Sequence, residues 1–143
     1  MSETSPVPPH RLAIRVYYED TDFSGLVYHA SYLRFLERGR TELLRGAGAD
    51  QSALHGDGTG VVFAVRRLAI EYLRPARMDD MVTVETGTRE VRGASLHVDQ
   101  RIVRGPDVLV TATVQVACLS GGRPVRVPDA LRHALAGPGR SAG

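Results

Sequence analysis

Hydrophobic and polar positions along the chain follow a helical period in one stretch and alternate in several others. Residues 11–18 alternate apolar and polar side chains, which predicts a strand. Residues 29–45 carry an apolar stripe that predicts an amphipathic helix, formed by Tyr32, Leu33, Phe35, Leu36, Gly39, Leu43 and Leu44. Because Gly39 lies on the apolar side, we expect the helix to approach a sheet closely there.

The pattern from residue 61 onward is that of β-strands. A long strand is predicted over residues 61–74, and its alternation shifts at Arg66 and Arg67, which indicates a bulge or a strong bend. Three more strands joined by short turns predict an antiparallel meander over residues 81–91, 95–103 and 108–119. A short helix is expected to open near Pro128. Together these elements predict an α+β domain with a long antiparallel sheet wrapped around one central helix.

The length of 143 residues suits one domain. We expect this domain to cover residues 11–136, between a flexible N-terminal tail (1–10) and a flexible C-terminal tail (137–143). Residues 49–60 are polar and rich in glycine and predict a loop. A single helix covers only one face of such a sheet, so a homodimer is expected.

Composition excludes several classes of protein. The sequence has no apolar run long enough to span a membrane and no signal peptide at its start, so we expect a cytoplasmic protein without a transmembrane segment. All 18 basic residues are arginine, which excludes Schiff-base chemistry on lysine. The net charge of +2 comes from arginines spread along the chain, which argues against nucleic-acid binding. Cys118 lies in an apolar strand and is expected to be a small core residue.

The stretch between the first strand and the helix carries the candidate chemistry. On an extended segment Asp20 and Asp22 would point to one side and Glu19 to the other. Gly25 lets the chain turn, and the helix then begins with free backbone N–H groups and a partial positive charge. A carboxylate beside a helix N-terminus suits attack on a carbonyl, because the N–H groups can receive the developing oxyanion.

These acids also fit two other interpretations. An aspartate before a helix is often only a cap, which stabilises the protein by about 0.5–2 kcal/mol. The order Asp20, Asp22, Ser24, Gly25 imitates the start of a calcium loop, but position twelve of that loop is Ser31 instead of glutamate. A strand also precedes it where a calcium loop needs a helix. No metal is therefore predicted.

Three blocks of the sequence resemble hotdog-fold acyl-CoA thioesterases of the 4-hydroxybenzoyl-CoA thioesterase family, in particular the bacterial branch associated with the Tol-Pal system. The first block is Asp20-Thr21-Asp22-Phe23-Ser24-Gly25-Leu26-Val27-Tyr28-His29-Ala30-Ser31-Tyr32, followed by Phe35-Leu36-Glu37-Arg38-Gly39-Arg40-Thr41-Glu42. The second is Val65-Arg66-Arg67-Leu68-Ala69-Ile70-Glu71-Tyr72-Leu73-Arg74-Pro75-Ala76-Arg77-Met78-Asp79-Asp80. The third runs from Arg92-Gly93-Ala94-Ser95-Leu96 to Gln100-Arg101-Ile102-Val103. The likeness covers about residues 11 to 120.

This resemblance implies a hotdog fold and the hydrolysis of an acyl-CoA to a carboxylic acid and free coenzyme A. No cofactor is implied, because coenzyme A enters as part of the substrate. The family forms homodimers and often homotetramers, with the active site between protomers. The Tol-Pal branch also implies a peripheral link to the cell envelope.

The resemblance also assigns roles to individual residues. Asp22 aligns with the catalytic aspartate and is expected to act as nucleophile or as general base; the sequence leaves this choice open. The backbone N–H of His29 aligns with the amide that polarises the carbonyl, and the His29 side chain is a candidate for orienting the substrate. Gly25 and Tyr28 are expected to shape the turn. Substrate-binding residues are expected among Arg66, Arg67 and Arg92, which suit the phosphates of coenzyme A, and Phe63.

Other functions remain open at this point. A thioesterase acting on acyl carrier protein would rely less on phosphate contacts and more on a basic surface. A hotdog module that binds acyl-CoA without turnover belongs to a different class. A carboxylate at position 22 speaks against this module, because a pure binder gains nothing from a charge beside the thioester. A dehydratase is disfavoured because no matching pair of histidine and acid stands out.

Overall fold

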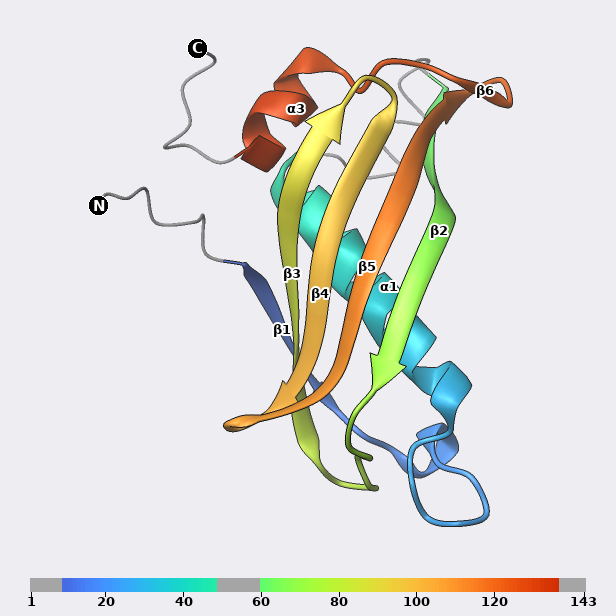
Figure 1. Cartoon of the computed structure of the whole chain (residues 1–143), viewed down its shortest axis with the longest axis vertical. Helices are drawn as coiled ribbons and strands as arrows, with labels where there is room; N and C mark the ends of the chain where they lie inside the picture. The colour runs from blue at the N-terminus through green and yellow to red at the C-terminus, as the bar shows by residue number, and fades with distance from the viewer. Residues whose placement is uncertain (1–8, 49–59, 137–143) are drawn as a thin grey trace, which may run out of the picture.

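Six strands form one antiparallel sheet, and a long helix packs across one face of it (Figure 1). The computed structural model describes residues 9–48 and 60–136. Most of the predicted loop 49–60 and of the two predicted tails therefore lies outside the described residues. The elements in chain order are β1 (His10–Arg15), a 3-10 helix (Tyr18–Asp20), α1 (His29–Gly46), β2 (Val61–Tyr72), β3 (Met81–Arg92), β4 (Ser95–Arg104), β5 (Asp107–Ser120), β6 (Arg123–Pro124) and α3 (Asp129–Ala136).

The strand order is β1-β3-β4-β5-β2, with β6 paired to the end of β5. The predicted meander is confirmed as β3, β4 and β5, which follow one another both in sequence and in space. The predicted irregularity in the long strand is also confirmed, because the pairing of β2 with β5 shifts between Val65 and Arg67. The sheet and its one long helix confirm the predicted α+β class. In the part of the chain that is described, no helix is long and apolar enough to cross a membrane.

The core lies between α1 and the sheet. Helix residues Phe35 and Leu36 are fully buried, and the strands alternate so that their apolar side chains face the helix. The strand residues buried there include Val84, Leu96, Val98, Ile102, Val114 and Val116. Leu33 was expected in the apolar stripe but is 39% exposed, so the buried stripe is narrower than predicted. Cys118 is buried as predicted.

Gly39 is the point of closest approach between α1 and the sheet. A methyl group built on Gly39 would lie 2.6 Å from Val84 Cγ1 and 2.7 Å from Thr86 Oγ1. Both distances are too short for a real contact, so a larger residue would push the helix away from β3. The close approach predicted for this glycine is confirmed.

The first strand ends earlier than the alternation predicts. β1 stops at Arg15, and the next residues turn into the short 3-10 helix. The cause is local: the Asp20 carboxylate accepts a hydrogen bond from the Tyr17 N–H at 2.8 Å, which closes a turn. Asp20 is buried by this contact, whereas Asp22 is exposed. The expectation that Asp20 and Asp22 point to the same side of an extended segment is therefore wrong.

Candidate active site at the start of the long helix

Asp22 lies in a small hairpin, residues 21–27, that leads into α1. The start of α1 is the lower end of this helix in Figure 1. Thr21 and Val27 form the closing bridge of the hairpin, and the Asp22 N–H donates to the Leu26 carbonyl at 2.9 Å. The Gly25 N–H donates to the Asp22 carbonyl at 3.0 Å. Gly25 has a φ of 84°, a left-handed conformation that glycine adopts without strain, and it lies in the turn of this hairpin.

The Asp22 carboxylate is exposed and accepts two hydrogen bonds from Ser24. It accepts the Ser24 N–H at 2.8 Å and the Ser24 hydroxyl. These two contacts, the hydroxyl first, lower the pKa of Asp22 below its ordinary value of 3.8, and the nearby His29 adds a smaller effect in the same direction. Asp22 is therefore ionised at neutral pH, as a nucleophile or general base must be.

Tyr28 and His29 form the start of α1. Tyr28 is the residue before the helix, and its N–H donates to the Asp20 carbonyl at 2.9 Å. The His29 ring lies 4.5 Å from the Tyr28 ring, measured between centroids, and both side chains are exposed. His29 is the first helical residue, so its amide is one of the N–H groups that have no acceptor within the helix. This amide and the Asp22 carboxylate thus belong to one short stretch at the positive end of the helix dipole.

Two tyrosines that sequence reasoning did not select hold this helix start in place. The Tyr72 hydroxyl, at the end of β2, donates to the His29 carbonyl at 3.2 Å. The Tyr32 hydroxyl accepts the Ala76 N–H at 2.9 Å, and burial raises the pKa of Tyr32 so that this phenol stays protonated. Only the apolar stripe marked Tyr32, and nothing in the sequence indicated which backbone groups the two hydroxyls would meet.

A cavity of about 300 Å³ lies between the second half of α1 and the start of β2. It is lined by Glu37, Arg40, Thr41, Leu43, Leu44, Phe63, Ala64, Val65, Leu96, Val98 and Val116. Phe63, a predicted substrate contact, therefore lines a cavity that combines apolar side chains with the polar residues Glu37, Arg40 and Thr41. Within one chain this cavity is remote from Asp22, because Thr41 is about 18 Å along the helix from His29 at 1.5 Å per residue.

The predicted arginines are not gathered around Asp22 in the single chain. Arg66 and Arg67 are exposed at the bulge of β2. Arg92 is exposed at the far end of β3, where its Nε lies 3.0 Å from Glu90 Oε2. The opposite end of β3 is the one near the hairpin, since Met81 pairs with Arg15. Their role in holding coenzyme A phosphates remains a prediction.

A metal site would need several His, Cys, Asp or Glu side chains close together. Across residues 9–48 and 60–136, no group of three or more His, Cys, Asp and Glu side chains is arranged to hold a metal ion. The calcium-loop interpretation would require Asp20 as a ligand. Instead, Asp20 Oδ2 accepts a hydrogen bond from the Tyr17 N–H, and Asp20 Oδ1 lies 3.8 Å from Arg34 Nη2.

Comparison with known proteins assigns the chain to a family. Residues 16–135 match the model of the thioesterase-like superfamily. The acyl-CoA thioesterase YbgC of Haemophilus influenzae is 46% identical over 124 residues, which are 85% of this chain and 90% of that protein.

Solved structures agree with this match. A probable thioesterase from Bartonella henselae superposes with a TM-score of 0.80 at 42% identity, covering 84% of this chain and 99% of that one. A thioesterase from Thermus thermophilus, complexed with coenzyme A and Zn, superposes with a TM-score of 0.79 at 26% identity over 90% of this chain and 92% of that one. These similarities confirm the predicted hotdog fold.

Proposed function

The chain belongs to the thioesterase-like superfamily, and from this premise we propose that it hydrolyses acyl-CoA thioesters with Asp22 as the reacting carboxylate. That the chain is a thioester hydrolase follows from its similarity to acyl-CoA thioesterases over most of its length. The observation that carries the role of Asp22 is its position: an ionised carboxylate in an open hairpin, seven residues before the first amide of the only long helix described.

In the proposed reaction the thioester carbonyl lies against the start of α1. The His29 N–H donates to the carbonyl oxygen and stabilises the negative charge that develops there. Asp22 either attacks the carbonyl carbon directly or removes a proton from an attacking water. When water attacks, the free acid forms directly; when Asp22 attacks, a mixed anhydride with its carboxyl group forms first, and water then hydrolyses this anhydride and restores Asp22. In both cases the C–S bond breaks, the sulfur of coenzyme A leaves and is protonated, and one water is consumed.

A second copy of the chain completes the site in this proposal. β2 is the last strand of the sheet, and it runs from the cavity beside the end of α1 to Tyr72 beside the start of α1. If two copies pair their β2 edges antiparallel about a two-fold axis, the end of one β2 meets the start of the other. The Asp22 hairpin of one copy then approaches the cavity of the second copy, where Phe63 would contact the acyl group.

The finer family assignment belongs to the same proposal. The three sequence blocks resemble the 4-hydroxybenzoyl-CoA thioesterase family and its Tol-Pal branch, which supports a cytoplasmic enzyme with a peripheral link to the cell envelope. The similarity to a thioesterase complexed with coenzyme A supports the nucleotide-bearing thioester as substrate. Arg66, Arg67 and Arg92 are proposed as phosphate contacts of the assembled dimer, because their guanidinium groups bind oxygens in pairs.

The test is thiol release from a panel of acyl-CoA substrates with short aliphatic, long aliphatic and aromatic acyl groups. The wild-type protein is expected to hydrolyse at least one class, and Asp22→Asn is expected to lower kcat by about 10²–10⁴-fold, the usual contribution of an acid–base group. Asp129→Asn is the matched control, because Asp129 is an exposed aspartate at the start of α3 and lies outside the hairpin. Tight binding of acyl-CoA without turnover by the wild type would instead assign the chain to the non-catalytic binding modules.

A further inference from the structure

Residues 73–80 connect β2 to β3 and contact the end of β1, the hairpin and α1. We call these residues the connecting segment. Its Asp80 carbonyl accepts the Val16 N–H at 2.9 Å, just beyond the end of β1. Its Ala76 carbonyl accepts the Val27 N–H of the hairpin at 2.9 Å, and the Ala76 N–H donates to the Tyr32 hydroxyl of α1. The hairpin and the first turns of α1 therefore share one support.

The tip of the hairpin is exposed, whereas its base is held on one side by two hydrogen bonds from Thr21 to the Tyr18 carbonyl. Asp22, Phe23, Ser24 and Gly25 are all exposed, and nothing lies within 4 Å of a methyl group built on Gly25. Behind these exposed residues, the Val27 hydrogen bond and a bridge between Leu26 and Arg77 join the hairpin to the connecting segment. The connecting segment thus supports the other side of the hairpin, so the location of the Asp22 carboxylate depends in part on where residues 76 and 77 are held.

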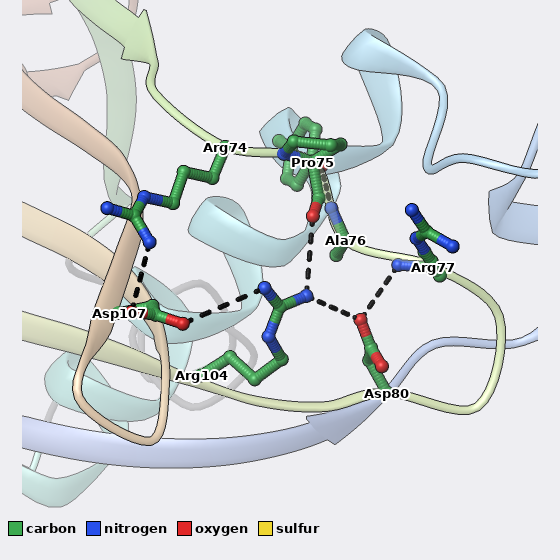
Figure 2. Close-up of polar contacts among 8 residues, drawn as sticks. Arg74, Pro75, Ala76, Arg77, Asp80, Arg104 and Asp107 are labelled. Carbon is green, nitrogen blue, oxygen red and sulfur yellow. Dashed lines mark hydrogen bonds and ion pairs between the residues drawn. The ribbon is translucent and has the colours of Figure 1, made fainter.

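One guanidinium group holds the connecting segment from the side of the sheet. Arg104, the last residue of β4, donates from Nη1 to Asp80 Oδ2 at 2.8 Å and to the Pro75 carbonyl at 3.3 Å (Figure 2). The same Asp80 oxygen accepts the Arg77 N–H at 2.9 Å. Residues 75, 77 and 80 are therefore tied to one charged pair, as the dashed lines in Figure 2 show.

The network extends to the start of β5. Arg104 Nη2 lies 3.9 Å from Asp107 Oδ2, and Asp107 Oδ1 accepts a hydrogen bond from Arg74 Nη1 at 3.1 Å. The side chains of Arg104 and Asp80 are only 34% and 26% exposed, so solvent screens their attraction less than that of the 58% and 49% exposed pair Arg89–Asp99. Partial burial opposes ionisation of Asp80, but the Arg77 N–H and Arg104 outweigh it and lower the pKa of Asp80.

We propose that Arg104 and Asp80 are positioning residues for the hydrolysis, which fix the connecting segment and through it the relative placement of the Asp22 carboxylate and the first amides of α1. The proposal rests on the proposed function of Asp22. The pair acts through the backbone of Ala76 and Arg77 rather than by touching the substrate. A misplacement of about 1 Å between reacting groups can cost about 10²-fold in rate, so a support of this kind affects turnover well before the fold is lost.

The experiment compares steady-state kinetics of Arg104→Gln, Asp80→Asn and their double variant with the wild type, at a temperature below the melting temperature of each. We expect each single variant to lower kcat by about 10-fold or more while KM changes by less than about threefold, because the lost placement acts mainly in the transition state. The double variant should be no slower than the slower single variant, since both changes break the same contact. Arg104→Lys, which keeps the charge, should restore part of the lost kcat.

Arg89→Gln is the matched control. It breaks an arginine–aspartate contact of similar length, 2.8 Å between Arg89 Nη2 and Asp99 Oδ1, which joins β3 to β4 without reaching the connecting segment. Its kcat should equal that of the wild type. If Arg104→Gln and Asp80→Asn lower only the melting temperature and keep wild-type kcat, the positioning role is overturned. If Arg104→Gln does not fold, Asp80→Asn decides the same question. Full turnover by Asp22→Asn would instead refute the proposed function on which this inference depends.

Discussion

At the scale of single residues, Asp22 owes its charge state to Ser24. The Ser24 hydroxyl and N–H both donate to the carboxylate, and the carboxylate is exposed, so no partner from a distant part of the chain is needed. The sequence pattern predicted a carboxylate before the helix, and the family resemblance selected Asp22; the contact with Ser24 was not predicted. The roles of Asp80 and Arg104 could not be predicted either, because they are 24 residues apart and meet only through the pairing of β3 with β4.

The contact with Ser24 predicts a pH effect. Ser24→Ala removes the hydroxyl donor, so the pKa of Asp22 should rise toward its ordinary value of 3.8. The acid limb of the profile of kcat/KM against pH reports the free enzyme's reacting base, and it should therefore move to higher pH in Ser24→Ala. At pH 7 Asp22 is ionised in both the wild type and Ser24→Ala, so their kcat/KM values should differ little.

Thr21→Val serves as the control for this shift. It also removes a hydroxyl from the hairpin, but that hydroxyl donates to the Tyr18 carbonyl at 2.7 Å and not to Asp22. Its acid limb should coincide with that of the wild type. An acid limb that is unchanged in Ser24→Ala would show that another group limits the rate at low pH.

At the scale of the elements, the helix and the strands were predictable because each repeats one simple pattern. The period of α1, the bulge in β2 and the turns of the meander are all visible as local changes of spacing. The end of β1 was not predictable in this way. The alternation continues beyond Arg15, but the hydrogen bond from the Tyr17 N–H to the Asp20 carboxylate closes a turn there. Leu33 was wrongly expected in the buried stripe, because the helical period shows which side of the helix is apolar but not how wide the buried stripe on that side is.

Gly39 allows a direct test of the contact between α1 and β3. Gly39→Ala should lower the free energy of unfolding by about 1–3 kcal/mol, because its methyl group would overlap Val84 and Thr86 in a packed core. In an exposed helix the same change would instead gain up to about 1 kcal/mol of helix propensity. Gly46→Ala is the matched control in the same helix, because nothing lies within 4 Å of a methyl group built on Gly46. This variant should be as stable as the wild type or more stable. Urea unfolding of both variants measures the difference.

At the scale of the whole molecule, the two halves of the proposed site, the Asp22 hairpin and the cavity, lie far apart within one chain. The Asp22 hairpin lies at the start of α1, and the cavity that contains Phe63 lies beside its end. Sequence patterns could not reveal this separation, because it follows from the direction in which β2 runs past the helix. Antiparallel pairing of two β2 edges brings the halves together, which makes a dimer part of the proposed chemistry.

Two inactive variants should therefore restore each other. Asp22→Asn lacks the carboxylate but keeps the cavity, and Thr41→Trp keeps the carboxylate but fills the cavity with a larger side chain. In a mixed dimer one of the two sites combines an intact Asp22 from one copy with an open cavity from the other. With random pairing, about a quarter of all sites are then intact.

The decisive measurement is acyl-CoA hydrolysis by the two variants co-expressed with different affinity tags and purified through both tags in succession. The mixed dimers are expected to hydrolyse at about half the wild-type rate per dimer, since one site of the two is complete. Each variant purified alone should stay far below that rate. Mixed dimers as inactive as the separate variants would contradict the claim that Asp22 of one copy acts on a thioester held in the cavity of the other.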